Sequence, residues 1–177
     1  MIVPMLFVLL CCGLVQSSNN TFSSVLSSAA FVHRQLTSSL AVTTLAGDGT
    51  TGANDGFGTS ATFNLPYNLC FSLDETFLLI VEAGNHRIRK YVLSTREVTT
   101  VAGSSQGFED NVGTLAKFFR PFEITIHPSG DFALIADWSN HRIRQLTLAT
   151  GAVSTFVGDG VASNAYGIGT SASVHGP

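Results

Sequence analysis

The sequence predicts an all-β fold built from a repeated antiparallel sheet, and three observations carry this prediction. The chain repeats itself at a fixed offset, because Asn-His-Arg-Ile-Arg begins at Asn85 and again at Asn140, 140 − 85 = 55 residues later. Each repeat reads as short apolar strands separated by polar turns, without a sustained helical period. Charged residues make up 12% of the 177 residues, against about 25% in typical domains, and there are 17 glycines.

The repeat extends well beyond the pentapeptide. The same offset superimposes many further identical pairs, namely Gly58 on Gly113, Ala61 on Ala116, Phe63 on Phe118, Pro66 on Pro121, Phe77 on Phe132 and Gly103 on Gly158. A third copy begins near residue 153, and an incomplete copy precedes the first at 42–49. We therefore expect repeat units near 42–97, 98–152 and 153–177, and the pentapeptide recurs because a whole unit recurs.

Four strands are expected in each complete unit. In the first unit, large apolar residues alternate over 67–73, and 77–81 is apolar on both faces, which indicates burial on both faces. A strand that admits polar residues follows at 87–93, and a β-branched strand at 98–102. Polar or glycine-containing turns separate the four strands. The second unit reads the same way, over 122–127, 132–136, 142–148 and 153–157.

A four-stranded sheet that is buried on both faces needs similar sheets packed on either side. Radial repetition of such sheets gives a β-propeller. An α-solenoid is excluded by the absence of helical periodicity, and a β-solenoid fits less well because its coils are usually shorter. The expected fold is a partial propeller of four-stranded antiparallel blades, with about two full blades and parts of two more.

The repeat unit resembles the NHL repeat over about residues 42–177. The resemblance is carried by Asn-His-Arg-Ile, by the acidic residue before it (Glu82 or Asp137), and by the connecting pattern Gly-Thr-x-Ala-x-Phe-x-x-Pro. It implies a TolB-like propeller, commonly of six blades. The family usually has glycine where this chain has Asn68 and Glu123. The resemblance also implies an incomplete chain, in which 42–46 would complete the last blade of a closed ring.

The N-terminal segment is expected to be a signal peptide. Residues 1–15 are apolar, which is shorter than the roughly 20 residues that span a bilayer, and cleavage after Ser17 fits the small residues there. A serine-rich linker, 18–41, follows and carries a glycosylation sequon at Asn19. The protein is therefore expected to be secreted or surface-exposed. An uncleaved membrane anchor is the alternative.

Charge argues against a nucleic-acid partner, and cysteine content argues against stabilisation by disulfides. The net charge is −3, without a run of Lys or Arg, so no basic face is expected for nucleic acid. After signal cleavage Cys70 would be the single cysteine, so stability must come from packing rather than from disulfides.

The repeated motif is expected to be structural. The asparagines would bond turn amides, and the first arginine of each motif would pair with the preceding acid. In this interpretation, Arg87 pairs with Glu82 and Arg142 with Asp137, while the histidines face the turn. The structural set is Glu82, Asn85, Arg87, Asp137, Asn140 and Arg142.

One face of the predicted propeller gathers the candidate binding residues. In an up-and-down sheet the motif turns, the long connectors 47–65 and 103–120 and the first residues of each inner strand lie at the same end, where binding usually concentrates. The candidates are Asn68, Glu123, Trp138, His86 and His141.

Two functions follow from that face. The favoured one is a binding module for a protein or small-molecule ligand, without a cofactor. The alternative is an enzyme of the six-bladed, gluconolactonase-like kind, acting on a lactone or ester with an axial metal, because Asn68 and Glu123 carry oxygens that suit Ca²⁺. No Ser-His-Asp order, G-x-S-x-G motif or phosphate loop is present, and catalytic residues are not assigned.

Overall fold

The computed structural model describes residues 42–177, of which residues 45–177 form one compact unit. The expected signal peptide, the linker and the sequon at Asn19 lie outside the described residues. Residues 42–46, expected to complete a ring as an outer strand, are not in a strand here. No helix among the described residues is long and apolar enough to cross a bilayer.

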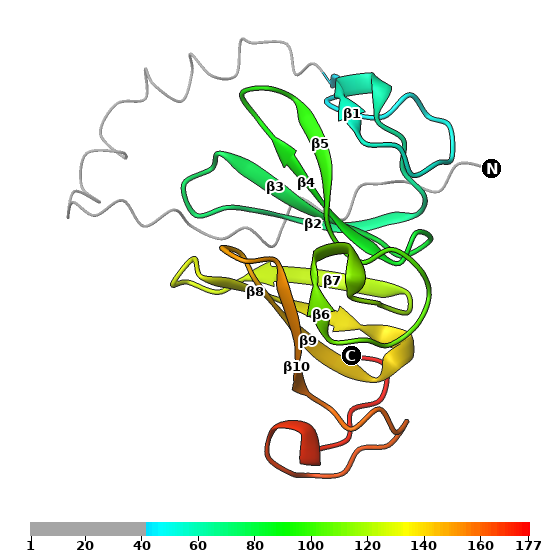
Figure 1. The fold of residues 1–177 in the computed structure, drawn as a ribbon, viewed down its shortest axis with the longest axis vertical. Helices are drawn as coiled ribbons and strands as arrows, with labels where there is room; N and C mark the ends of the chain where they lie inside the picture. The colour runs from blue at the N-terminus through cyan, green and yellow to red at the C-terminus, as the bar shows by residue number, and fades with distance from the viewer. Residues whose placement is uncertain (1–41) are drawn as a thin grey trace, which may run out of the picture. The chain divides into compact units, whose positions relative to one another are not determined.

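Two five-stranded antiparallel sheets make up the fold (Figure 1). The first blade has the order β1-β5-β4-β3-β2 and the second has the order β6-β10-β9-β8-β7. The strands of the first blade are β1 (Gly56–Phe57), β2 (Pro66–Phe71), β3 (Phe77–Glu82), β4 (Arg87–Val92) and β5 (Glu97–Ala102). The strands of the second blade are β6 (Asn111–Val112), β7 (Pro121–Ile126), β8 (Phe132–Asp137), β9 (Arg142–Thr147) and β10 (Ala152–Val157). The all-β, partial-propeller prediction is confirmed.

The four main strands of each blade form where the sequence pattern predicts them. The tight turns between them depend on local chemistry. Ser72 Oγ accepts hydrogen bonds from the backbone N–H groups of Thr76 and Phe77, both at 3.0 Å, and closes the first turn of the first blade. Glu75 takes a positive φ of 56° in that turn. A turn of mostly polar residues, closed by the Ser72 hydroxyl, therefore reverses the chain between two apolar strands.

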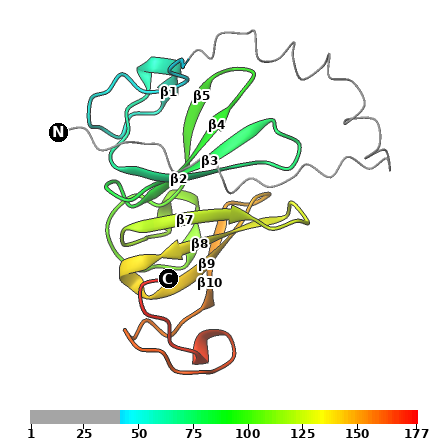
Figure 2. The ribbon, with the colours of Figure 1, turned by 180° about the vertical axis from the view of Figure 1, so that it is seen from behind.

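The main core lies between the two blades. Leu79 and Val81 of β3 pack against Ile124 of β7 and Ile135 of β8, together with Phe118 from the connector. Strands β2 and β7 lie side by side in both views of the ribbon (Figures 1 and 2). The doubly apolar pattern of β3 follows from this packing, because each of its faces meets a different layer.

The opposite face of the first blade is only partly covered. Leu78 and Ile80 are covered by the connector through Ala61 and Phe63. Leu69 of β2, on the same face, remains 36% exposed, whereas its repeat counterpart Ile124 is 5% exposed because the first blade covers it. The two repeats therefore carry the same apolar positions in different surroundings.

The connectors contain structure that the sequence pattern did not predict. Strands β1 and β6 add a fifth, outermost strand to each sheet, pairing with β5 and β10. Three-residue 3-10 helices accompany them and the turns; these are η2 (Gly58–Ser60), η3 (Gly113–Leu115), η4 (Trp138–Asn140) and η5 (Gly169–Ser171). Strands of two residues are too short to show an alternating pattern.

Candidate functional site

The acidic residue before each motif is fully buried and paired with the second arginine of the motif. Glu82 Oε2 lies 2.7 Å from Arg89 Nη1, and Asp137 Oδ2 lies 2.8 Å from Arg144 Nη1, with all four side chains at 0% exposure. The residues pair because β3 and β4, like β8 and β9, are adjacent antiparallel strands. Burial raises the pKa of the Asp137 carboxyl, while hydrogen bonds from Asn140, Phe119 and Arg144 act in the opposite sense.

The expected pairs Glu82–Arg87 and Asp137–Arg142 were wrong. Arg142 instead donates from Nη1 to the carbonyl of Asn140 at 3.0 Å and from Nη2 to the carbonyl of Asp159 at 2.7 Å. Arg87 donates to the carbonyl of Ala53 at 3.3 Å. Arg87 and Arg142 do lie directly opposite the acids in the strand register, but their guanidinium groups bond to connector and turn carbonyls. The arginine two residues further along the strand shares that face and reaches the buried carboxylate diagonally.

A second acid also bonds to each buried arginine. Arg89 Nη2 donates to Asp55 Oδ1 at 2.8 Å, and the other oxygen of Asp55 accepts the N–H of Thr100 at 3.1 Å. Asp110 repeats these bonds with Arg144 and Thr155. Asp55 and Asp110 were not predicted as partners of the arginines, although their separation equals the repeat offset of 55 residues and could have identified them as equivalent positions.

The motif asparagines attach each turn to its connector. Asn85 Nδ2 donates to the carbonyl of Gly52 at 2.8 Å and to Glu82 Oε1 at 2.9 Å. Asn140 does the same with Gly107 and Asp137, both at 2.8 Å. The asparagine is thus a donor to a carbonyl and a carboxylate, rather than the expected partner of turn amides.

The motif histidines contact residues of the next repeat unit. His86 Nδ1 accepts the backbone N–H of Arg120 at 3.1 Å, and its ring lies edge-on to Phe119 with 5.9 Å between centroids. His141 Nδ1 accepts the N–H of Gly176 at 3.2 Å, and its ring lies 5.4 Å from that of His175. The backbone at both histidines is in the left-handed region, with φ of 56° at His86 and 52° at His141. These contacts use the Nδ1 atom of each ring.

Asn68 does not stand free at the mouth of a channel. Its Oδ1 accepts the N–H of Ile124 on the neighbouring inner strand at 3.4 Å, which bridges β2 and β7. Its counterpart Glu123 is exposed. Among residues 42–177, no three His, Cys, Asp or Glu side chains gather in a group that could hold a metal ion.

Three aromatic rings form a continuous row at the end of the sheets that carries the motif turns. Tyr67 of β2 lies 4.2 Å from Phe122 of β7 between ring centroids, and Phe122 lies 5.5 Å from Trp138 of η4. Tyr67 and Trp138 are 47% and 42% exposed. We call these three residues the aromatic row. The sequence analysis named Trp138 but missed Tyr67 and Phe122, which occupy equivalent repeat positions.

Comparisons with known proteins agree with this repeat architecture. The chain is 30% identical over 105 residues to NHL repeat-containing protein 2 of Bos taurus, a match that spans 58% of this chain and 14% of the relative. It is 34% identical over 117 residues to the chloroplastic protein SUPPRESSOR OF QUENCHING 1 of Arabidopsis thaliana, spanning 62% of this chain and 11% of the relative.

The chain resembles NHL-repeat proteins. It spans only a small part of the curated relatives it matches, and no protein-family model matches it. The fold is similar to the crystal structure of an auxiliary nutrient binding protein from Bacteroides thetaiotaomicron, with a TM-score of 0.55 and 22% identity, covering 63% of this chain and 31% of that one. In this chain the motif residues make the same contacts in both repeats, whereas Trp138 of the aromatic row stands where the first repeat has Ala83.

Proposed function

We propose that this protein is a secreted or surface-exposed binding module of the NHL-repeat type, in a six-bladed ring, and that its ligand contacts the aromatic row. The single observation that carries the proposal is the row itself: two exposed rings on either side of the half-buried Phe122, which contacts both, drawn from two blades. Exposed aromatic residues supply large contact areas at low entropic cost and often dominate binding energy.

Trp138 is the member of the row that the fold least requires. The repeat places Ala83 at the equivalent position of the first blade, and the first motif turn forms without an aromatic side chain. A side chain that is large, exposed and dispensable to the repeat is a candidate for ligand contact. The fold similarity to a protein described as an auxiliary nutrient binding protein supports a small-molecule ligand.

Intrinsic fluorescence tests this proposal directly, because Trp138 is the only tryptophan in the chain. We expect a panel of soluble oligosaccharides and short peptides to contain members that shift its emission and protect it from acrylamide quenching. Phe122→Ala should abolish the shift, whereas Phe57→Ala, at an exposed aromatic residue outside the row, should not.

Binding that survives Trp138→Ala at full affinity, measured by calorimetry, would reject the row as the ligand site. Secretion is tested separately, by sequencing the N-terminus of tagged protein from the culture medium, where Ser18 is expected as the first residue. Recovery of intact Met1 in the membrane fraction would instead establish the uncleaved anchor.

A further inference from the structure

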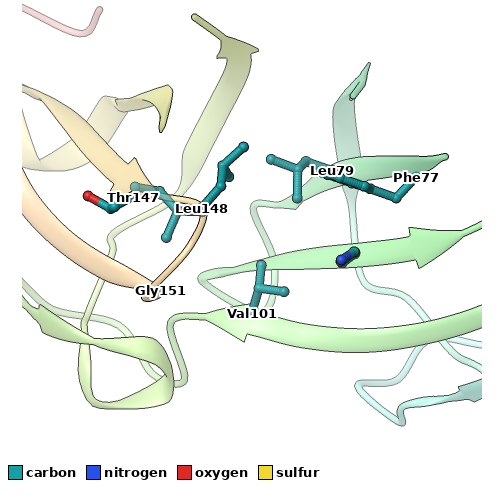
Figure 3. Close-up of a pocket in the computed structure, with 8 residues that line it drawn as sticks. Phe77, Leu79, Val101, Thr147, Leu148 and Gly151 are labelled. Carbon is teal, nitrogen blue, oxygen red and sulfur yellow. The ribbon is translucent and has the colours of Figure 1, made fainter. Parts of the chain in front are cut away.

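A small pocket lies on the seam between the two blades, apart from the aromatic row. Its walls come from Phe77 and Leu79 of β3, Val101 of β5, and Thr147 and Leu148 at the end of β9, with Lys90 of β4. Figure 3 shows Leu79 and Phe77 on one side of the pocket, with Thr147 and Leu148 across from them. We call this the seam pocket. Any molecule bound there touches both blades.

The size of the seam pocket limits what it can hold. Its volume is about 100 Å³. An apolar cavity of about 150 Å³ is known to accept benzene, so this pocket suits a smaller apolar group, such as a short branched alkyl chain. The walls facing the space are mostly leucine, valine and phenylalanine, which favour an alkyl group over a polar one.

Lys90 supplies the single formal charge of the seam pocket. Its Nζ lies 4.3 Å from the centroid of the Phe77 ring, and it forms no ion pair with any residue between 42 and 177. Lys117, by contrast, pairs with Glu109 at 2.9 Å. An ammonium group beside an apolar pocket, with no acidic partner from the described residues, is complementary to an anionic ligand group.

The repeat indicates that the fold does not require this cation. Phe77 and Leu79 correspond to Phe132 and Leu134 in the second blade, so the apolar positions are kept. Lys90 corresponds to Gln145, so the second blade lacks the positive charge. The buried arginines and their acids are present in both repeats, as expected of residues that each blade needs for folding. Lys90 therefore has the character of a residue that serves a ligand.

We infer that the seam pocket binds a short, branched aliphatic carboxylate. The alkyl chain lies among Leu79, Val101 and Leu148, and the carboxylate meets the Lys90 ammonium. This inference is independent of the proposed function, because the seam pocket and the aromatic row share no residue. A ligand that contacts both blades also stabilises the folded chain by mass action.

The test is a nuclear magnetic resonance titration of the full chain with isovalerate, followed through leucine and valine methyl signals. Isovaleramide, which has a similar shape but no charge, is the matched ligand control. We expect saturable shifts of the Leu79, Val101 and Leu148 methyls with isovalerate, and binding at least about tenfold weaker for the amide, since a charge-assisted bond is lost.

Two lysine variants make the test specific. Lys90→Gln, which introduces the residue found in the second repeat, should weaken isovalerate binding about tenfold, while Lys117→Gln should leave it unchanged. Leu148→Phe should block the pocket. An unchanged unfolding midpoint in the absence of ligand verifies that Lys90→Gln still folds.

Three results would overturn the inference. They are equal affinity for the acid and the amide, retention of full affinity in Lys90→Gln, and shifts confined to methyl groups outside the seam pocket. Failure of the fluorescence experiment on Trp138 would leave this result unaffected, so the two proposals fail separately.

Discussion

The imidazole Nδ1 of His86 accepts a hydrogen bond from the backbone N–H of Arg120 at 3.1 Å, and His141 repeats this relationship with Gly176. A ring nitrogen that accepts a hydrogen bond carries no proton, so the imidazole is neutral with its proton on Nε2. Burial, and then the charge of Arg120, lower the pKa of His86 from its ordinary value of 6.5. His86 therefore connects its blade to the next repeat unit only while its ring is neutral.

Acidification should weaken the fold through His86. The folded-state pKa lies below the unfolded-state value of 6.5, so the unfolded chain binds the proton first as the pH falls. The contribution to stability is present above pH 6.5 and is lost as the pH falls through the lower, folded-state pKa. His86→Asn removes the titration and tolerates the left-handed backbone. Urea unfolding between pH 8 and pH 5 should show a shallower decline in this variant.

Amide exchange gives a second measure of the same bond. In the His86→Asn variant, the Arg120 amide should exchange faster at neutral pH than in the unaltered chain, because it loses its acceptor. The loss should also reduce stability by about 1 kcal/mol, as for other single hydrogen bonds. Identical pH profiles and exchange rates in the two proteins would show that the histidine has no such role.

The two arginines of a motif should differ strongly in their effect on stability. Arg144→Ala leaves the buried Asp137 without its ion partner, and breaking a buried pair costs about 3–5 kcal/mol. Arg142→Ala removes bonds to two carbonyls near the surface and should cost about 1 kcal/mol. Urea unfolding of both variants measures which substitution causes the larger loss of stability. A larger loss for Arg142→Ala would restore the pairing that the sequence suggested.

Two glycines with similar backbone angles allow the stability cost of a steric contact to be distinguished from the cost of a strained backbone. Gly103 has a φ of 84°, and a Cβ there would lie 2.4 Å from the carbonyl oxygen of His86. Gly49 has a φ of 88°, with nothing within 4 Å of its Cβ position. Gly49→Ala should cost about 1–2 kcal/mol from the left-handed backbone alone. Gly103→Ala should cost clearly more in thermal unfolding; equal losses would contradict the contact.

The repeat-related pair Leu69 and Ile124 should respond differently to truncation. Ile124 is packed between the blades, so Ile124→Ala should reduce the free energy of unfolding by about 2–5 kcal/mol. Leu69 is partly exposed, so Leu69→Ala should cost about 1 kcal/mol. Denaturant titrations of the two variants provide the measurement. Equal costs would mean that a further layer covers Leu69 in solution.

The main strands could be predicted from the sequence because burial leaves a pattern of apolar residues, alternating where one face is buried and continuous where both are. Phe77 to Val81 is apolar at every position, and the structure buries it against different layers on its two faces. The short strands β1 and β6 left no such pattern. Their position depends on pairing with β5 and β10, which are distant in the sequence.

The candidate site was predictable only in part, because side-chain partners depend on three-dimensional register. The motif turn and Trp138 were identified from spacing and composition. The partners of the arginines could not be identified in this way, because Arg87 and Arg89 are the same residue type and only Arg89 reaches Glu82. The contact between Tyr67 and Phe122 also depends on the packing of β2 against β7, which no local pattern reports.

The buried arginines have a consequence for how such a chain lengthens in evolution. Arg89 bonds to Glu82, to the carbonyls of Thr62 and Asn54, and to Asp55, all within the preceding 35 residues. Arg144 bonds to groups at the same sequence separations of 7, 27, 35 and 34 residues. A gene duplication of one 55-residue segment therefore copies the charge together with all of these partners. A newly inserted copy can bury its arginine at once, without waiting for compensating mutations elsewhere.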